Sequence, residues 1–441
     1  MWIRIAVALS VLIPALLVDA TRPIWQTFLL ALAGFGGGRL IEMGARGTPK
    51  RVPLLLAGVL AAASGLAAVF ALAPGRSEGR GDARPRAAGA SGVDAGPPVA
   101  PPRQRPGSWT AVSVDSKGAC GVRDDATAWC WESGSTLGNG SSHGEEHTTD
   151  EPVRVATLHD VRAVSIGGGV ACALDGIDAW CWGWNYNGAV GVPSTGSYDH
   201  RTKPERVPID ATITAVSAGS RHACALDADG GVWCWGSNSV GQVGAASQGD
   251  RDVRGPTRVA DLPPVRAIDV GRDASCAITR DARLFCWGDL ALHGSAGVAS
   301  FGPVTLMDVA APTSIAVGDS QACVATEKGP VTCWGWWAQP KGDRDFRRMR
   351  QHPELVGAKA VAVGTNHACA LTASGEARCW GANYQGQLGD GTRTESQTAV
   401  EPFDLPRFEQ IAVDELESCG ISERALWCWG HVEPPPWLGR P

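Results

Sequence analysis

Two kinds of hydrophobic pattern divide this chain. Near its start, apolar residues run on with few interruptions over residues 3–18, 24–38 and 52–73. From Trp109 onward, apolar and polar residues instead alternate over short runs, such as Ile213-Thr-Ala-Val-Ser-Ala-Gly219, with Gly- and Asp-rich turns between them. Long apolar runs are typical of membrane-spanning helices, whereas alternation is typical of β-strands. The pattern therefore predicts N-terminal transmembrane helices followed by an all-β region.

The third apolar stretch, residues 52–73, is the best candidate to cross a membrane. It has 22 residues and no charge, and about 20 apolar helical residues span a bilayer. The loop before it, residues 39–51, carries four Lys/Arg and one acidic residue, which the positive-inside rule assigns to the cytoplasm. The chain after this stretch is then expected outside the cytoplasm. Four arginines between residues 76 and 86 oppose that orientation, and a buried soluble helix over 52–73 is an alternative.

The segment between the two patterns has its own composition. Residues 74–107 consist mainly of Pro, Ala, Gly and Arg, with almost no large apolar residue. Such a segment cannot bury enough apolar surface to fold, so we expect a disordered linker. The predicted domains are an anchor of two or three hydrophobic segments (1–73), this linker (74–107) and a repeat domain (108–441). Cleavage by signal peptidase after Val18-Asp-Ala20 is a further possibility for the first segment.

The repeat domain contains seven copies of one unit. Its 14 cysteines form seven pairs, and the first cysteines of successive pairs are 46 to 52 positions apart. Each unit contains four short strand-like runs, and the high Gly content of the chain suits tight turns between them. A four-stranded unit with a period near 50 residues predicts a closed β-propeller, here with seven blades.

Strand register explains the cysteine pairs. If Cys224 lies opposite Cys234 in an antiparallel hairpin, then Leu226 lies opposite Val232, and opposed residues come close enough for a disulfide. Seven disulfides require an oxidising compartment. Zinc binding is disfavoured because eight or nine residues separate the cysteines of each pair, and free buried cysteines are the other alternative. The predicted pairs are Cys120–Cys130, Cys172–Cys181, Cys224–Cys234, Cys276–Cys286, Cys323–Cys333, Cys369–Cys379 and Cys419–Cys428.

The units resemble the RCC1-type (regulator of chromosome condensation) repeat. Gly364-Thr-Asn-His-Ala-Cys-Ala-Leu371 leads into Trp380-Gly-Ala-Asn-Tyr-Gln-Gly-Gln-Leu-Gly389, and the third unit has the same motifs after Gly219 and Trp235. The resemblance covers residues 108–441 and implies a seven-bladed β-propeller. The paired cysteines are not part of the eukaryotic pattern, and they indicate an exported bacterial variant.

Several units depart from this motif. Trp131 is followed by Glu132, where the other six units have Gly. The fourth and fifth units lack the Asn-x-x-Gly-Gln loop. The last unit ends in the proline-rich residues 431–437, so its outer strand is expected to be short or supplied from elsewhere in the chain.

Charge and motif content limit the function. Residues 108–441 contain 27 Lys/Arg and 40 Asp/Glu, a balance that disfavours nucleic-acid binding. The nucleotide exchange known for the family acts on a nuclear GTPase, and an anchored, acidic propeller is not expected to perform it. His222, His367 and the tryptophans of the Trp-Gly motif belong to the repeat, so we assign them to packing. No catalytic motif is present, and we expect neither an enzyme, nor a cofactor, nor a metal site.

Aromatic residues in the loops are the candidate binding residues, because exposed aromatics are enriched at binding hot spots. We therefore expect a non-catalytic protein–protein interaction module, tethered to the membrane with its propeller outside the cytoplasm, in the periplasm or at the cell surface. Its partner is an unidentified protein. Packing of these aromatics between blades is one alternative. A carbohydrate or cell-wall binding module with regularly repeated exposed tryptophans is another. The candidates are Trp184, Tyr186, Trp336, Trp337, Asn383 and Tyr384.

Overall fold

The computed structural model describes residues 102–430, except residues 106, 117, 133–135, 142–148, 150, 197, 245–250, 291–298, 306–308 and 336–348. The three apolar stretches, nearly all of the linker, and residues 431–441 therefore lie outside the described residues. Among the residues that are described, no helix has the length and hydropathy needed to cross a membrane.

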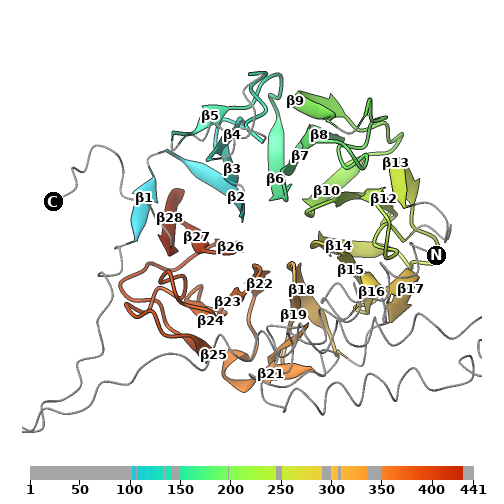
Figure 1. Cartoon of the computed structure of the whole chain (residues 1–441). Coiled ribbons are helices and arrows are strands. Elements are labelled where there is room, and N and C mark those ends of the chain that lie inside the picture. Colours follow the sequence, from blue (N-terminus) through green and yellow to red (C-terminus); the bar gives the residue numbers. More distant parts are fainter. Residues whose placement is uncertain are drawn as a thin grey trace, which may run out of the picture. The chain divides into compact units, whose positions relative to one another are not determined.

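The described residues form a β-propeller of seven antiparallel four-stranded sheets arranged around a central axis (Figure 1). This confirms the predicted seven-bladed, all-β architecture. The innermost strands are β2 (Trp109–Asp115), β6 (Val161–Gly167), β10 (Ile213–Ala218), β14 (Val265–Val270), β18 (Pro312–Val317), β22 (Ala360–Val363) and β26 (Gln410–Val413). The second strands are β3 (Gly118–Arg123), β7 (Val170–Asp175), β11 (His222–Asp227), β15 (Ala274–Thr279), β19 (Gln321–Thr326), β23 (His367–Leu371) and β27 (Glu417–Ser422).

The third strands carry the second cysteine of each pair, and the fourth strands form the rim. The third strands are β4 (Ala128–Trp131), β8 (Asp178–Trp184), β12 (Val232–Ser237), β16 (Leu284–Asp289), β20 (Val331–Gly335), β24 (Ala377–Gly381) and β28 (Ala425–Gly430). The outer strands are β5 (Val153–Arg154), β9 (His200–Arg206), β13 (Asp252–Arg258), β17 (Ala299–Thr305), β21 (Arg350–His352), β25 (Ser396–Val400) and β1 (Arg103–Arg105), with a short 3-10 turn η2 (Pro353–Leu355) after β21.

The register of the middle hairpins is the predicted one. Cys224 lies opposite Cys234 and Leu226 opposite Val232, and both pairs lie on the same face of the hairpin because side chains alternate between faces with a period of two. All seven predicted disulfides are formed, each with a Cα–Cα distance of 4.1 Å. Each cysteine is at most 2% exposed, so the disulfides lie inside the blades.

The ring is closed by a strand from the beginning of the propeller. β1 pairs with β28 and completes the last sheet, in the order β1-β28-β27-β26 (Figure 1). The sequence had assigned residues 103–105 to the linker, so that boundary is wrong. Arg-Gln-Arg has no apolar alternation, and its strand pairs through backbone groups with an edge formed some 320 residues later in the chain. Composition alone does not reveal such a pairing.

The tryptophans of the Trp-Gly motif pack between neighbouring blades. Trp182 and Trp235 are fully buried. The Trp182 indole donates to the Thr136 carbonyl at 2.7 Å, and the Trp235 indole to the Ala189 carbonyl at 2.9 Å, each in the preceding blade. Burying one large ring at each seam excludes much apolar surface from water. The prediction that these tryptophans form the core is confirmed.

Candidate functional site

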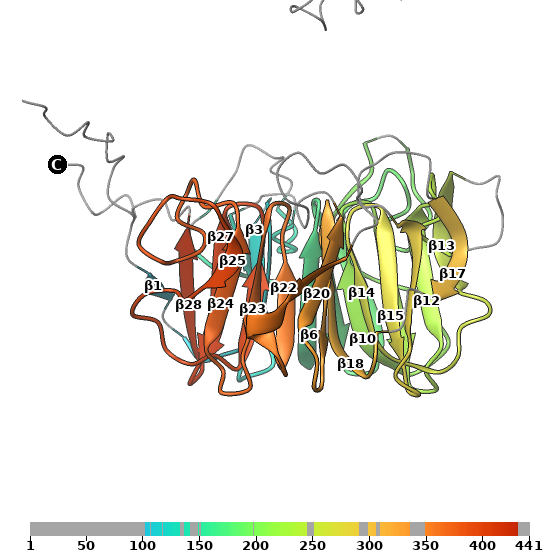
Figure 2. The same cartoon turned by 90° about the horizontal axis from the view of Figure 1, so that it is seen from below.

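The propeller has two faces, seen at opposite ends of the strands in Figure 2. Because the strands of a blade are antiparallel, the turn after each inner strand and the loop after each third strand lie at the same end. We call this end the loop face. The hairpin turn between the second and third strands lies at the opposite end, which we call the link face, together with the connection to the next blade.

The loop of the second blade, residues 185–199, is held from within by two buried side chains. The Asn185 amide donates to Asp199 Oδ2 at 2.8 Å, and its Oδ1 accepts from the Val190 amide at 3.0 Å. Arg201 pairs with Asp199 at 2.9 Å. Burial acts to raise the pKa of Asp199, but hydrogen bonds from Thr195, Arg201 and Asn185 together outweigh it and lower the pKa. This network preforms the loop.

Aromatic side chains project from this loop. Tyr186 is 46% exposed and Tyr198 is 91% exposed. The half-buried Trp184 ring packs against His200, with 5.0 Å between ring centroids. Tyr198 and His200 were not among the predicted binding residues, although the loop that carries Tyr198, residues 185–199, is one residue longer than its counterparts 238–251 and 382–395. The surface on this blade is larger than predicted.

The loop of the sixth blade, residues 382–395, separates its two predicted binding residues. Asn383 is 1% exposed, its amide donates to Asp390 Oδ1 at 3.0 Å, and its Oδ1 accepts from the Leu388 amide at 3.0 Å. Its side chain therefore holds the loop, as Asn185 does in the second blade, and is not accessible to a partner. Tyr384 is 47% exposed, and its hydroxyl accepts from Asn366 at 2.7 Å.

The predicted residues do not form one patch. Tyr186 and Tyr384 lie on the same face, but the seventh and first blades stand between theirs on the shorter path around the ring. Trp336 and Trp337 lie outside the described residues. Two separate aromatic positions are therefore defined on the loop face, one on the second blade and one on the sixth.

The mouth of the central channel on the loop face is acidic. A cavity of about 90 Å³ there is lined by residues from all seven blades, including Asp115, Asp319 and Asp414. Each carboxylate accepts hydrogen bonds, two of them from other blades: Asp115 accepts from the Gly168 amide of the second blade, Asp319 accepts from Ser220 Oγ of the third blade at 3.1 Å, and Asp414 accepts from two backbone amides of its own turn at 2.6 Å. Burial, with Asp115 and Glu132 nearby, raises the pKa of Asp414 to about 7.

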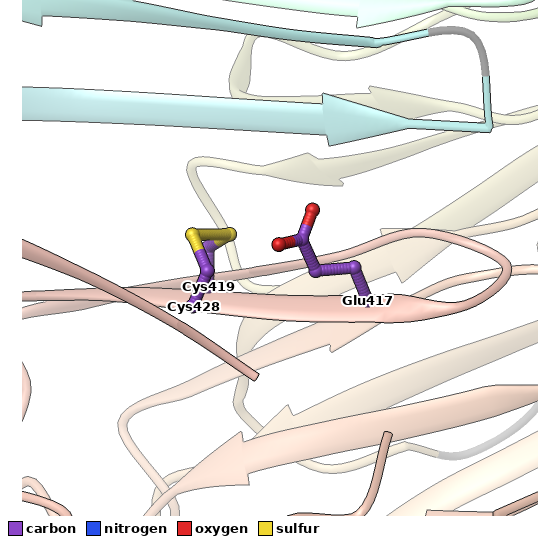
Figure 3. Close-up of side chains that lie close together, drawn as sticks. All are labelled: Glu417, Cys419 and Cys428. Atoms are coloured by element: carbon purple, nitrogen blue, oxygen red, sulfur yellow. A yellow bond between two sulfur atoms is a disulfide. The ribbon is translucent and has the colours of Figure 1, made fainter. Parts of the chain in front are cut away.

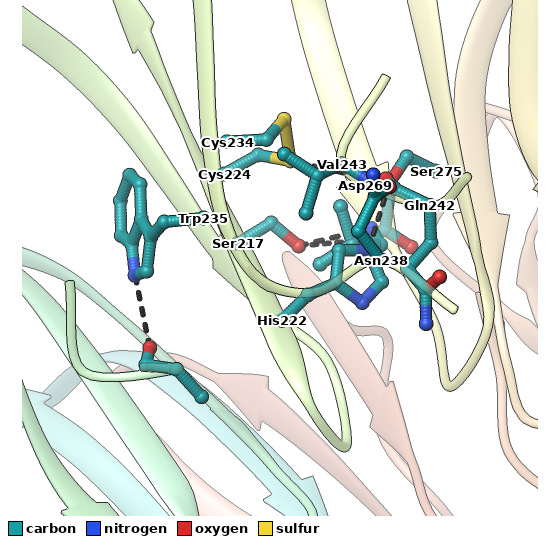
Figure 4. Close-up of a disulfide and its surroundings, with 12 residues drawn as sticks. Ser217, His222, Cys224, Cys234, Trp235, Asn238, Gln242, Val243, Asp269 and Ser275 are labelled. Carbon is teal, nitrogen blue, oxygen red and sulfur yellow. Dashed lines mark hydrogen bonds between the residues drawn. A yellow bond between two sulfur atoms is a disulfide. The ribbon is translucent and has the colours of Figure 1, made fainter. Parts of the chain in front are cut away.

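His222 and His367 each connect two blades. His222 Nε2 lies 2.8 Å from Ser275 Oγ in the next blade, and that hydroxyl donates back to the Gln242 carbonyl at 2.8 Å (Figure 4). Since the hydroxyl proton is committed to the carbonyl, Nε2 must carry the ring proton and donate it. Burial lowers the pKa of His222, and likewise that of His367, to about 3. Both side chains are structural, as predicted.

One group of potential metal ligands occurs among the described residues. A carboxylate oxygen of Glu417 and the sulfurs of Cys419 and Cys428 lie within 4.8 Å of one another. The two sulfurs are joined in a disulfide (Figure 3), and the thiolate is the form that binds metals. With its disulfide formed, this group does not have a metal-binding donor set.

Family comparisons agree with the repeat geometry. Models of the regulator of chromosome condensation (RCC1) repeat match residues 178–226 and 229–278, and also residues 213–242 and 358–387. This chain contains RCC1-type repeats. The matches fall in the second, third, fourth and sixth blades of the RCC1-type propeller, which include both loops that carry exposed tyrosines.

Curated relatives match part of the chain. It is 25% identical over 150 residues to the Arabidopsis thaliana ultraviolet-B receptor UVR8, and 28% identical over 203 residues to the mitochondrial RCC1 domain-containing protein RUG3 of the same plant. It is 26% identical over 150 residues to the human probable E3 ubiquitin-protein ligase HERC4. These matches cover 33%, 43% and 33% of this chain, and 34%, 44% and 14% of the relatives.

Solved structures share the fold. Human WBSCR16 superposes with a TM-score of 0.62 at 20% identity, covering 73% of this chain and 87% of that one. Yeast RCC1 (Prp20), in a structure with Kap60 bound, superposes with a TM-score of 0.58 at 18% identity, covering 74% and 81%. Similarity at this level of identity establishes the propeller architecture alone.

Proposed function

We propose that this RCC1-type propeller is a non-catalytic protein-binding module that engages its partner through the loop face. The main observation in support is that Tyr186, Tyr198 and Tyr384 project into solvent from preformed loops, while the tryptophans of the repeat motif are buried. A rigid loop that presents tyrosine loses little conformational entropy on binding.

The chemistry of the channel supports a role without catalysis. Its mouth encloses about 90 Å³, far below the roughly 300 Å³ at which small-molecule pockets begin. Three of the carboxylates that line it, Asp115, Asp319 and Asp414, accept hydrogen bonds from turn residues, and His222 and His367 are committed to inter-blade hydrogen bonds. These groups stabilise the fold.

We further propose that the propeller lies outside the cytoplasm, in the periplasm or at the cell surface, and is tethered through the N-terminal apolar segments. Seven disulfides support an oxidising compartment, since such bonds rarely persist in the cytosol. The apolar run over residues 52–73 supports the tether.

The carbohydrate-binding alternative has less support. A carbohydrate-binding propeller is expected to expose a tryptophan at the same position of each unit, where its ring could stack on a sugar. The tryptophans of the Trp-Gly motif are instead at most 4% exposed: Trp182, Trp235, Trp287, Trp334, Trp380 and Trp429.

Site-specific photocrosslinking of the full chain in its own cells tests the binding proposal. A photoreactive phenylalanine analogue replaces Tyr186 or Tyr384, and the control position is Ile177, which is 55% exposed. Ile177 lies in the hairpin turn before β8, at the opposite end of the blade that carries Tyr186. We expect a discrete protein adduct from a loop-face position and none from Ile177. Equal labelling from all three positions, or adducts with glycan only, would contradict the proposal.

A further inference from the structure

Glu132 occupies a backbone position at which each of the other six blades has a glycine. The equivalent glycines all have positive φ angles, between 92° and 111°, and Glu132 keeps a φ of 74°. A side chain in this left-handed region is disfavoured. At Gly236 a Cβ atom would lie 2.6 Å from the Arg221 carbonyl oxygen. The first blade therefore accommodates a side chain that its counterparts exclude. The equivalent glycines are Gly183, Gly236, Gly288, Gly335, Gly381 and Gly430.

The first blade makes room for Glu132 by an exchange across the hairpin. In the third blade His222 lies opposite Gly236, and the other five blades likewise place a side chain on the second strand opposite that glycine. In the first blade Ala119 pairs with Trp131, which places Gly118 at the level of Glu132. In the first blade, therefore, the second strand carries the glycine and the residue after the third strand carries the side chain, which is the reverse of the arrangement in the other six blades.

Glu132 uses this position to contact the strand that closes the ring. Its Oε1 accepts from Arg105 Nη2 at 3.2 Å, and the Arg105 guanidinium lies 4.9 Å from the centroid of the Trp131 ring. Arg105 belongs to β1, the outer strand of the seventh blade, whereas Trp131 ends β4 in the first blade and Glu132 directly follows it. The side chain of Arg105 is only 20% exposed.

The pairing that holds β1 in the seventh blade is short. The strand has three residues and pairs with β28 over three positions, Arg103 with Cys428 through Arg105 with Leu426. An edge strand of this length forms few backbone hydrogen bonds. An arginine held by both a carboxylate and an aromatic ring supplements them.

We propose that Arg105, Trp131 and Glu132 form a closure lock that keeps β1 in the seventh blade and couples it to the loop face. The coupling runs through the base of the first blade's loop, because the Glu132 amide donates to the Thr149 carbonyl at 2.7 Å.

Hydrogen exchange on the full chain, with its disulfides intact, tests the lock. Glu132→Gln removes the charge with little change in shape, and Glu132→Gly restores the residue of the other six blades. The matched control is Asp178→Asn, because Asp178 pairs with Arg206 at 2.6 Å between the third and outer strands of one blade, away from the closure. We expect two- to fivefold faster exchange of the β1 and β28 amides in both Glu132 variants, and no change there in Asp178→Asn.

The glycine variant separates the lock from a purely local role. If Glu132 only strains its own backbone, Glu132→Gly relieves that strain, and exchange at β1 stays the same or slows, which overturns the lock. The charge-swapped pair Arg105→Glu with Glu132→Arg restores the ion pair but not the contact of a guanidinium with Trp131, so it is expected to recover part of the protection lost in each single variant. For the coupling, Arg105→Gln should also speed exchange in peptides covering 132–154. Faster exchange confined to β1 and β28 would overturn the coupling.

Discussion

The imidazole of His222 donates to the hydroxyl of Ser275 in the next blade across 2.8 Å. The same arrangement recurs between His367 and Ser418, also at 2.8 Å. In each case the serine hydroxyl donates to a glutamine carbonyl of the histidine's own blade, Gln242 at 2.8 Å and Gln387 at 3.1 Å. Two of the seven seams therefore carry a matched set of histidine, glutamine and serine.

Replacing the serine alone should be costly. Ser275→Ala leaves the His222 Nε2 proton and the Gln242 carbonyl without their partner, and an unsatisfied buried polar group costs about 1–3 kcal/mol. We expect the free energy of unfolding, measured by urea denaturation of the oxidised protein, to fall by that amount.

The chain supplies its own control for this variant. The second and third blades place Val170 and Ala223 at the positions of His222 and Ser275. The double variant His222→Val with Ser275→Ala should therefore be less destabilised than Ser275→Ala, because both polar groups are removed together. A double variant that is the less stable of the two would contradict the hydrogen-bond assignment.

These histidines also make stability depend on pH. Burial lowers their pKa in the folded state to about 3, against an ordinary value of 6.5. The unfolded chain therefore binds more protons than the folded one between these values. The contribution of His222 and His367 is fully present above pH 6.5 and is lost as the pH falls toward 3. Thermal unfolding of a His222→Val/Ser275→Ala variant should depend less steeply on pH between 6 and 4 than that of the parent protein.

Asp414 acts in the opposite direction at the channel mouth. Burial raises its pKa to about 7, so its stabilising contribution is complete below the ordinary value near 4 and is lost as the pH rises through 7. Asp414→Asn keeps an oxygen that accepts from the two turn amides but carries no charge. We expect the variant to exceed the parent in unfolding free energy at pH 8 by at least about 1 kcal/mol.

The advantage of Asp414→Asn should shrink as the pH falls and vanish only below about pH 4, where the carboxyl of the unfolded parent is protonated as well. A comparison of thermal midpoints from pH 4 to 8 measures this directly, because the histidine contributions are the same in both proteins. A difference that is constant across this range would show that Asp414 does not titrate in the folded state.

Features that recur in the repeats, such as strand register, could be predicted from the sequence. Contacts that occur in a single blade could not. Cysteine spacing and alternation gave the hairpin register, as the pairs Cys224–Cys234 and Leu226–Val232 show. Repetition also identified His222 as structural. Asn383 was misassigned because a side chain that holds a loop and one that binds a partner have the same polar signature. Glu132 was noted as an exception, but its contact with Arg105 depends on ring closure between distant segments.

The disulfides give a direct test of the proposed compartment. Protein recovered from its own cells and treated with an alkylating reagent under denaturing conditions should gain no adduct before reduction and 14 adducts after it, matching its 14 cysteines. Intact mass spectrometry counts these adducts. Fourteen free thiols before reduction would contradict the extracytoplasmic assignment, because no pair would have been oxidised.

Removing β1 should open the last blade. A fragment that begins at residue 108 lacks Arg103–Arg105 and leaves the outer edge of β28 unpaired, whereas one that begins at residue 102 retains the strand. An unpaired strand edge is a template for association with other chains. We expect the shorter fragment to have a lower unfolding temperature and to self-associate in size-exclusion chromatography. The longer fragment should remain monomeric under the same conditions. Equal thermal stability and equal elution would show that β1 is dispensable and that the seventh blade is stable with three strands. Because the two fragments differ by only six residues and contain the same seven disulfides, any difference between them reports on the closing strand and its connection to the first blade.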